Sequence, residues 1–492
     1  MSRICFAALG AALACSTGAA AQRPDSLSVA EVRAAIAFLS HDSLRGRATP
    51  SPGLDAATRW AARRFAALGL RPAGDSGTYL QHYRVWRTRF VPESSTVQLV
   101  GRRTLTLRLG HDVDWVRASA PVRGPIAGPV FVLTGTADST APFGHHDVRG
   151  AIILHLAPMH ERGRTEIPDW LLAAGAQAGV ATWILVVDRP EAVWRTWTAR
   201  ISEPRTVVPG TLGTWPFPIL EVRDESVAEF LIGQGVTQAG VRPIPVLRPA
   251  LAPLEGVTAR LRLRERVLSR RTAANVLAVL PGRDSAAHVL VTAHLDGQGV
   301  GVMVGGDSIY NGADDNASGV AAVLGAAKLL RGTRPDRTVV FALLTGREAG
   351  GWGADYYIEH PALPLERLAA MVTIEAIGRN LPDSLAVIRS DMTAAGPALV
   401  SARSAARDFG LTVIDDPWPE ARLWRQGDHA TFAARGIPVY YLFNGKHADL
   451  HQPFDEAARV RPAQVTLVAR FLGAFTRALA DSSSFTRSGA NP

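Results

Sequence analysis

Histidine and acidic side chains follow several apolar segments in the C-terminal half of the chain, each where an expected strand ends. HVLVTA is followed by His294 and, two residues later, by Asp296. TVVFALLTG is followed by Arg347 and Glu348, and MVTI is followed by Glu375. Because ligands of open α/β sheets bind beyond the carboxyl ends of the strands, we expect these side chains to share one edge.

Two loops add groups of the same kind. YNGADDNASG places Asp314 and Asp315 at the start of an expected helix. The segment after the strand IPVYYLF contributes His447, Asp449, His451 and Asp455. A mixture of imidazole and carboxylate groups without thiols suits Zn, Mn or Co with room for water. Any one of these residues alone is better explained as a helix cap or an ion pair, but their convergence favours a metal centre.

The spacing His294-Leu-Asp296 has a further use, since a carboxylate behind a metal-bound imidazole can fix the tautomer of the ring. No serine elbow, phosphate-binding loop or HExxH helix competes with the metal reading. GQGVGVMVGG lacks the spacing of a dinucleotide-binding loop and is expected to be a mobile loop at the rim of the site. His145, His146, His155 and His160 are also possible ligands, although isolated histidines are mostly ordinary surface residues.

From residue 271 onward, continuous apolar strands alternate with helices. NVLAVL, HVLVTAH, TVVFALLT, MVTIEAIG and IPVYYLF are the expected strands, and ASGVAAVLGAAKLLRG and AQVTLVARFLGAFTRALA are the expected helices. Strands that are apolar on both faces indicate a sheet covered on both sides. The sequence therefore predicts an α/β fold with a mainly parallel mixed sheet flanked by helices.

Two helices are expected before this region. Ser28 and Glu31 form a capping-box pattern that opens a helix ending near Leu39, and LDAATRWAARRFAALG forms a second helix that Gly69 ends. Between residues 91 and 270 short strand-like runs (TVQLV, TLTLRL, GPVFVL, AIILHL, TWILVV) alternate with turn residues, and WLLAAGAQAG is the clearest helix. We interpret this stretch as a smaller, separate β-rich domain.

The composition is that of a globular protein. The chain has 492 residues, of which 47% are hydrophobic and 20% charged, and its formal net charge is +9. The positive charge is nearly all arginine, since Lys328 and Lys446 are the only lysines. These arginines are scattered rather than grouped in a stripe, so a nucleic-acid partner is not expected.

Residues 1–21 have the layout of a secretory signal peptide, with one basic residue, a short apolar stretch and small residues before Gln22. The apolar stretch is too short to span a membrane, and no other long apolar run indicates a transmembrane segment. The expected location is therefore secreted or periplasmic. Anchoring as a lipoprotein through Cys15 is less favoured, because ALAC matches the usual lipoprotein motif poorly. The only cysteines are Cys5 and Cys15, so the mature chain has no disulfide.

The ordered motifs AHLDGQGVG, DSIYNGADDNASGVAA, TGREAGGWGADYY, VTIEAIGRN, GDHATFAARGIP and LHQPFD resemble those of the di-zinc exopeptidases of clan MH. This family includes secreted bacterial aminopeptidases and glutamate carboxypeptidase II. The resemblance implies that 22–90 is the N-terminal part of the peptidase domain and 91–270 an insert similar to a protease-associated domain. It further implies that 271–482 is the zinc peptidase catalytic domain. The polar C-terminal tail at 483–492 is expected to be disordered on its composition and position.

The resemblance also implies a role for individual residues. His294 and Glu375 would bind one zinc ion, Glu348 and His451 the other, and Asp315 would bridge the two ions. Asp314 would be a neighbour that is not a ligand. The expected substrate is a peptide or aminoacyl compound, cleaved by a metal-bound water.

Arg347 departs from the family pattern, because it occupies the position of the carboxylate that acts as general base. Arginine remains protonated at neutral pH and cannot accept a proton. Three hypotheses therefore stand: a zinc exopeptidase that works by an altered route, a non-catalytic relative that binds metal and peptides, and an acyl transferase like the glutaminyl cyclases. The added positive charge is also expected to weaken the second zinc site unless Arg347 turns toward a carboxylate such as Asp296 or Asp314.

Overall fold

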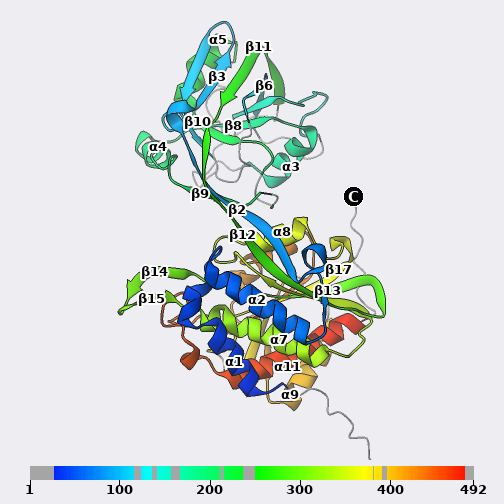
Figure 1. The fold of residues 1–492 in the computed structure, drawn as a ribbon. Coiled ribbons are helices and arrows are strands. Elements are labelled where there is room, and N and C mark those ends of the chain that lie inside the picture. The colour runs from blue at the N-terminus through cyan, green and yellow to red at the C-terminus, as the bar shows by residue number, and fades with distance from the viewer. Residues whose placement is uncertain are drawn as a thin grey trace, which may run out of the picture.

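The computed structural model describes residues 27–115, 124–135, 141–156, 167–209, 211, 215–236, 250–380, 382–390 and 396–482. The predicted signal peptide, His160 and the predicted disordered tail lie outside these residues. Within them, two large sheets occupy two lobes, which the long strands β2 and β12 connect (Figure 1).

The first sheet has ten strands and carries the C-terminal part of the chain. Its order is β19-β18-β20-β17-β13-β16-β12-β2-β9, with β1 beside β12. The strands are β1 (Arg71–Pro72), β2 (Leu80–Phe90), β9 (Arg205–Val207), β12 (Glu265–Leu280), β13 (Asp284–His294), β16 (Arg337–Leu344), β17 (Leu368–Glu375), β18 (Ser384–Arg389), β19 (Thr412–Asp415) and β20 (Val439–Phe443).

The central strands β16, β13, β17 and β20 run parallel to one another. Strand β12, which contains the predicted strand NVLAVL, runs antiparallel to β16 and to β2. The predicted α/β fold with a mixed sheet and flanking helices is thus confirmed, and the parallel part is its centre.

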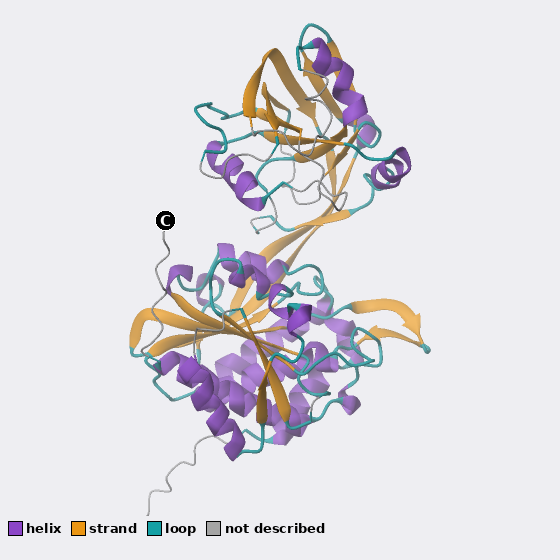
Figure 2. Ribbon diagram, turned by 180° about the vertical axis from the view of Figure 1, so that it is seen from behind, coloured by secondary structure: helices purple, strands orange, loops and turns teal. Residues whose placement is uncertain are grey.

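Helices cover both faces of this sheet, as Figure 2 shows from behind. Alternate side chains of β16 explain the arrangement: Val339, Phe341 and Leu343 point into a core with α1, α2, α7, α9 and α11. Val340 and Ala342 pack on the opposite face with α8. The helices of this lobe are α1 (Val29–Leu39), η1 (Asp42–Arg47), α2 (Pro52–Ala67), η4 (Ala313–Ser318), α7 (Gly319–Leu330), α8 (Trp352–Glu359), α9 (Gly396–Asp408), α10 (Ala430–Ala433) and α11 (Pro462–Asp481).

Local sequence patterns predicted the first two helices correctly. Ser28 caps α1 and forms the predicted capping box with Glu31. Helix α2 ends at Ala67, and Gly69 follows with a φ of 71°, a backbone conformation that glycine adopts without strain. The segment expected to be a rim loop is instead a two-stranded hairpin, β14 (Gly299–Val304) and β15 (Asp307–Tyr310), which projects from the lobe (Figure 1).

The second sheet lies within the range 91–270 and has the order β4-β3-β11-β6-β7-β8-β10-β5. All five strand-like runs of the sequence form strands here. Its strands are β3 (Thr96–Val100), β4 (Thr104–Arg108), β5 (Val113–Trp115), β6 (Ile126–Thr134), β7 (Ile152–Leu156), β8 (Thr182–Val187), β10 (Ile219–Arg223) and β11 (Ala250–Arg262). The helices of this lobe are α3 (Asp169–Ala178), α4 (Glu191–Thr198) and α5 (Asp224–Gly233). Its assignment as a protease-associated domain remains a prediction.

No helix among the described residues combines the length and the apolar character that crossing a membrane requires.

His155 of β7 is a buried core residue rather than a surface residue. It is 2% exposed, and its Nε2 lies 2.8 Å from the carbonyl oxygen of Gly135. Trp183 Nε1 lies 3.4 Å from Nδ1 of the same ring. Since the indole can only donate, the neutral ring has its proton on Nε2, and both nitrogens are then satisfied. Burial lowers the pKa of His155 to about 4.

This environment predicts acid sensitivity of the β-rich lobe. The folded-state pKa lies below the unfolded value of 6.5, so the unfolded state takes up the proton first as the pH falls. The stability is complete above pH ~6.5 and falls by about 3 kcal/mol toward pH ~4. Urea unfolding between these values, followed by tryptophan fluorescence, should show this slope in the wild type and lose it in His155→Gln. Parallel pH profiles for the two proteins would contradict the assignment.

Candidate metal centre

Three neighbouring parallel strands end at the same edge of the first sheet and supply the side chains that the sequence singled out. His294 is the last residue of β13 and pairs in register with Leu344, the last residue of β16. Glu375 is the last residue of β17. Glu348 lies in the loop after β16, and His451 lies in the loop after β20.

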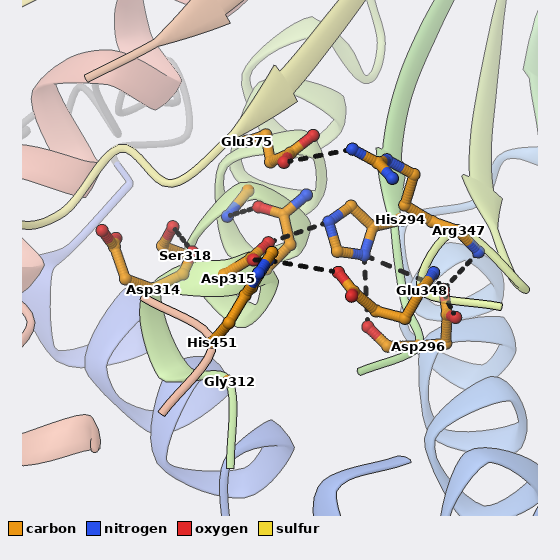
Figure 3. Close-up of polar contacts among 12 residues, drawn as sticks. His294, Asp296, Gly312, Asp314, Asp315, Ser318, Arg347, Glu348, Glu375 and His451 are labelled. Atoms are coloured by element: carbon orange, nitrogen blue, oxygen red, sulfur yellow. Dashed lines mark hydrogen bonds and ion pairs between the residues drawn. The ribbon is translucent and has the colours of Figure 1, made fainter. Parts of the chain in front are cut away.

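Asp315 is the centre of the cluster (Figure 3). Its Oδ1 lies 3.0 Å from Nε2 of His294, and its Oδ2 lies 2.9 Å from Nε2 of His451. Nε2 of His451 also lies 3.9 Å from Oε1 of Glu348. The two carboxylate oxygens therefore face two different imidazoles, which is the arrangement that a carboxylate bridging two cations needs.

Charges within the cluster shift the protonation of its members. Burial lowers the pKa of His294, but the hydrogen bond to Asp315 and the nearby carboxylates outweigh burial and raise it to about 10. Burial raises the pKa of Asp315, but the hydrogen bonds to the two histidines hold it well below its usual range. The site is thus a buried set of negative charges that draws cations or protons.

The donor set fits zinc. One ligand atom each from His294, Asp315 and Glu348 lie within 4.8 Å of one another. Two ligands of one zinc ion, each at ~2.0–2.2 Å, are at most ~4.4 Å apart, which is close to this spread. Imidazole and carboxylate ligands without thiols are typical of zinc sites that retain an open position.

Asp296 is completely buried behind His294. Its carboxylate accepts backbone N–H groups from Arg347 at 3.1 Å and Glu348 at 3.2 Å, and its Oδ1 lies 3.8 Å from Nδ1 of His294. The loop that presents Glu348 is therefore attached to the loop that presents His294. Asp296 acts mainly as an anchor for this loop, a role that its spacing from His294 alone does not indicate.

Asp314 points away from the cluster (Figure 3). Its Oδ1 accepts the N–H of Gly378 at 2.6 Å, and its Oδ2 lies 3.3 Å from His447. Asp455 accepts the backbone N–H groups of Asp314 and Asp315, each at 3.0 Å. Asp314 and Asp455 thus shape the turn η4 and leave Asp315 as the residue of this pair that faces the histidines.

Arg347 faces Glu375 rather than Asp296 or Asp314. Its Nη2 lies 3.8 Å from Oε1 of Glu375, and its Nε is buried without a hydrogen-bond partner. Gly427, with a φ of 83°, lies against the guanidinium, where a Cβ atom would come within 3.3 Å of Nε and Nη2. Burial lowers the pKa of Arg347, but Glu375, Asp428 and Glu348 outweigh it and raise the pKa above its ordinary value.

Two contacts of the cluster carried no signal in the sequence. Gln298 donates from Nε2 to Glu348 Oε2 at 3.3 Å. Tyr441 of β20 lies beside Glu375, and burial raises the pKa of its hydroxyl well above 10. Gln298 lies in the motif AHLDGQGVG and Tyr441 in an apolar strand, but neither pattern indicates a contact with the cluster, so only their neighbours in space identify them.

The arrangement is a candidate metal centre at the carboxyl edge of an α/β sheet, and residues 275–476 match the sequence model of peptidase family M28. These residues belong to that family, which confirms the resemblance to the clan MH exopeptidases over this part of the chain.

Relatives of this chain with curated descriptions are found among fungal proteins. A probable zinc metalloprotease of Pyrenophora teres is 30% identical over 216 residues, which cover 37% of this chain and 44% of the relative. One of Leptosphaeria maculans is 31% identical over 211 residues, covering 36% of this chain and 49% of the relative. The chain therefore spans less than half the length of the curated relatives it matches.

Among solved structures, an aminopeptidase from Aneurinibacillus sp. strain AM-1 aligns with a TM-score of 0.45 at 17% identity, covering 94% of this chain and 97% of that chain. A zinc aminopeptidase from Bacillus subtilis aligns with a TM-score of 0.44 at 16% identity, covering 91% and 94%.

Asn275 holds the loop of Glu348 from the other side. Its side chain is fully buried; Nδ2 donates to Gln81 Oε1 and to the carbonyl oxygen of Gly353, both at 2.9 Å. Its Oδ1 accepts the N–H of Thr345 at 3.0 Å. Asn275 thus fastens both ends of the loop between β16 and α8.

Asn275→Leu should lower the free energy of unfolding by about 3 kcal/mol, because it leaves several buried polar groups without partners. Chemical unfolding measures this loss. Gln177→Leu removes an exposed amide from α3 and serves as control, with an expected change within ~0.5 kcal/mol. A cost for Asn275→Leu as small as that of the control would contradict the role of this side chain.

Proposed function

We propose that the protein is an exported, zinc-dependent exopeptidase of the aminopeptidase type that acts on peptides or aminoacyl compounds. The observation that carries the proposal is the cluster of two imidazoles and three carboxylates at one sheet edge, with Asp315 between the two histidines. The match of residues 275–476 to peptidase family M28 supports it.

His294 and Glu375 would hold one zinc ion, Glu348 and His451 the other, and Asp315 would contact both. Zinc in such a site supplies a Lewis acid for the scissile carbonyl and lowers the pKa of a bound water. Asp296 and Asp455 keep the ligand loops in place through backbone N–H groups.

Arg347 limits which group could accept the proton of the metal-bound water. Its guanidinium cannot take a proton from water, so another group must do so. Asp428 is a buried carboxylate whose charge interacts with that of Arg347, and burial raises its pKa to about 7. Asp428, whose charge also interacts with that of His294, is the candidate base of an altered and slower route.

The same arginine favours a second candidate function, a metal-binding relative that binds peptides without cleaving them. Arg347 is 28% exposed at its side chain and already faces a carboxylate. It would accept an acidic group of a ligand in the same way. Among the described residues, no contact favours the glutaminyl-cyclase-like alternative.

Zinc should bind in two unequal steps. We expect about two zinc ions per chain under zinc-replete conditions, with the second bound at least tenfold more weakly, because Arg347 lies against Glu375. Calorimetric titration of the metal-free protein separates the steps. His451→Ala should remove one step while the protein stays folded. A wild type that binds no zinc at all would defeat the proposed function.

Arg347→Glu places a carboxylate at the position of the family's base. We expect hydrolysis of aminoacyl substrates to rise by ~10²–10⁴-fold, because that group can accept a proton from water. Arg334→Glu, an exposed residue before β16, changes the net charge equally and serves as control. If the wild type is active and Arg347→Glu gives no gain, the base lies elsewhere than position 347, and the alignment of this motif with the family is wrong. If neither protein cleaves any peptide, the non-catalytic function stands.

A further inference from the structure

Arg47 lies at the end of η1, far from the family-matched residues in sequence but next to the metal centre in space. It is 1% exposed. Within the described part of the chain, its guanidinium donates only to backbone carbonyl oxygens: Nε to Leu295 at 3.0 Å, Nη1 to Asn311 at 2.8 Å and also to Leu39, and Nη2 to Gly312 at 3.2 Å.

The carbonyls of Leu295, Asn311 and Gly312 belong to the two loops that carry the proposed ligands, and that of Leu39 belongs to the end of α1. Leu295 lies between His294 and Asp296, and Gly312 precedes η4, which holds Asp315. The carbonyl of Arg47 in turn accepts the N–H of Gly297 at 3.2 Å. One residue therefore attaches the loop after β13 to the loop before α7.

Only arginine has the donors for this arrangement. A planar guanidinium offers five N–H donors in a fixed fork, whereas a lysine ammonium is a single point charge on a flexible chain. The neighbouring Gly46 shows how closely the segment fits, since a Cβ atom there would lie 2.5 Å from the carbonyl oxygens of Gly299 and Tyr310.

Charge adds to the geometry. Burial lowers the pKa of Arg47 to about 10, while Asp296, Asp455, Asp315 and Glu348 favour its protonated form. The guanidinium thus stays charged at neutral pH. It offsets part of the repulsion among carboxylates that would otherwise push the two loops apart.

We propose that Arg47 is a positioning residue for the metal centre, which fixes the separation between the His294 loop and the Asp315 loop before metal binds. This inference rests on the zinc-binding part of the proposed function. Arg47 reaches no ligand atom itself and acts through the backbone of both loops.

The test compares zinc affinity in variants of the full chain. Metal-free Arg47→Met should bind zinc at least tenfold more weakly than the wild type in a competition titration with a chromophoric chelator, and Arg47→Lys should lie between the two. Arg337→Met is the matched control, because Arg337 also donates to backbone carbonyls, of Leu479 and Ser482, but at the opposite end of β16. The control should lower the unfolding midpoint and leave the zinc dissociation constant within twofold.

Hydrogen exchange of the metal-free proteins gives a second readout. Amides of 295–297 and 311–313 should exchange at least tenfold faster in Arg47→Met and remain unchanged in Arg337→Met. Zinc affinity within twofold of the wild type in folded Arg47→Met, or unaltered exchange in both loops, overturns the proposal. If Arg47→Met does not fold, the same two measurements on Arg47→Lys decide. If the wild type binds no zinc, the proposed function fails, and the inference about metal positioning fails with it; faster exchange would then show only a structural tie.

Discussion

Repulsion among carboxylates with little access to water is the constraint on which the organisation of the lobe with the candidate metal centre depends. Asp296 and Asp315 are buried, Glu348 and Glu375 are half-buried, and their convergence on one sheet edge makes their mutual repulsion strong. The chain meets this repulsion with backbone N–H groups, with two imidazoles that share Asp315, and with two arginines.

The two arginines act in different ways. Arg47 faces carbonyl oxygens and joins loops, whereas Arg347 faces a carboxylate and enters the cluster itself. The first supports the geometry of the proposed metal site, and the second would compete with a metal for an oxygen of Glu375. In such a site the loops that present the proposed ligands are fixed by hydrogen bonds, but the net charge around the ligands is altered by Arg347. Metal binding and catalytic turnover must therefore be measured separately.

The convergence of the proposed ligands could be predicted from the sequence because each of them follows a strand or lies at a helix start. His294, Glu348 and Glu375 stand at the ends of apolar runs, and the parallel pairing of these runs brings them together. The capping box at Ser28 likewise placed α1 from local pattern alone.

The remaining features depend on contacts that no local pattern encodes. The guanidinium of Arg347 lies against Gly427, which is 80 positions later in the chain and leaves room for it. The antiparallel course of β12 follows from its long pairing with β2, and an apolar strand has the same appearance in either direction. From the sequence His155 is expected at the surface, whereas in the structure the neighbouring strands bury it.

The route of the chain through the two lobes has a consequence for the order of assembly. Arg47 donates a hydrogen bond to the carbonyl of Leu295, which is 248 positions away in the sequence. Strand β2 can pair with β12 only after β12 has been synthesised. Such distant contacts form late, because the loop between them has to close first. During synthesis the ten-stranded sheet with the proposed ligands therefore remains incomplete until the β-rich lobe has been synthesised. The cluster of proposed ligands is complete only after the segment with His451 has left the ribosome. The candidate metal centre is therefore among the last parts of the molecule to form.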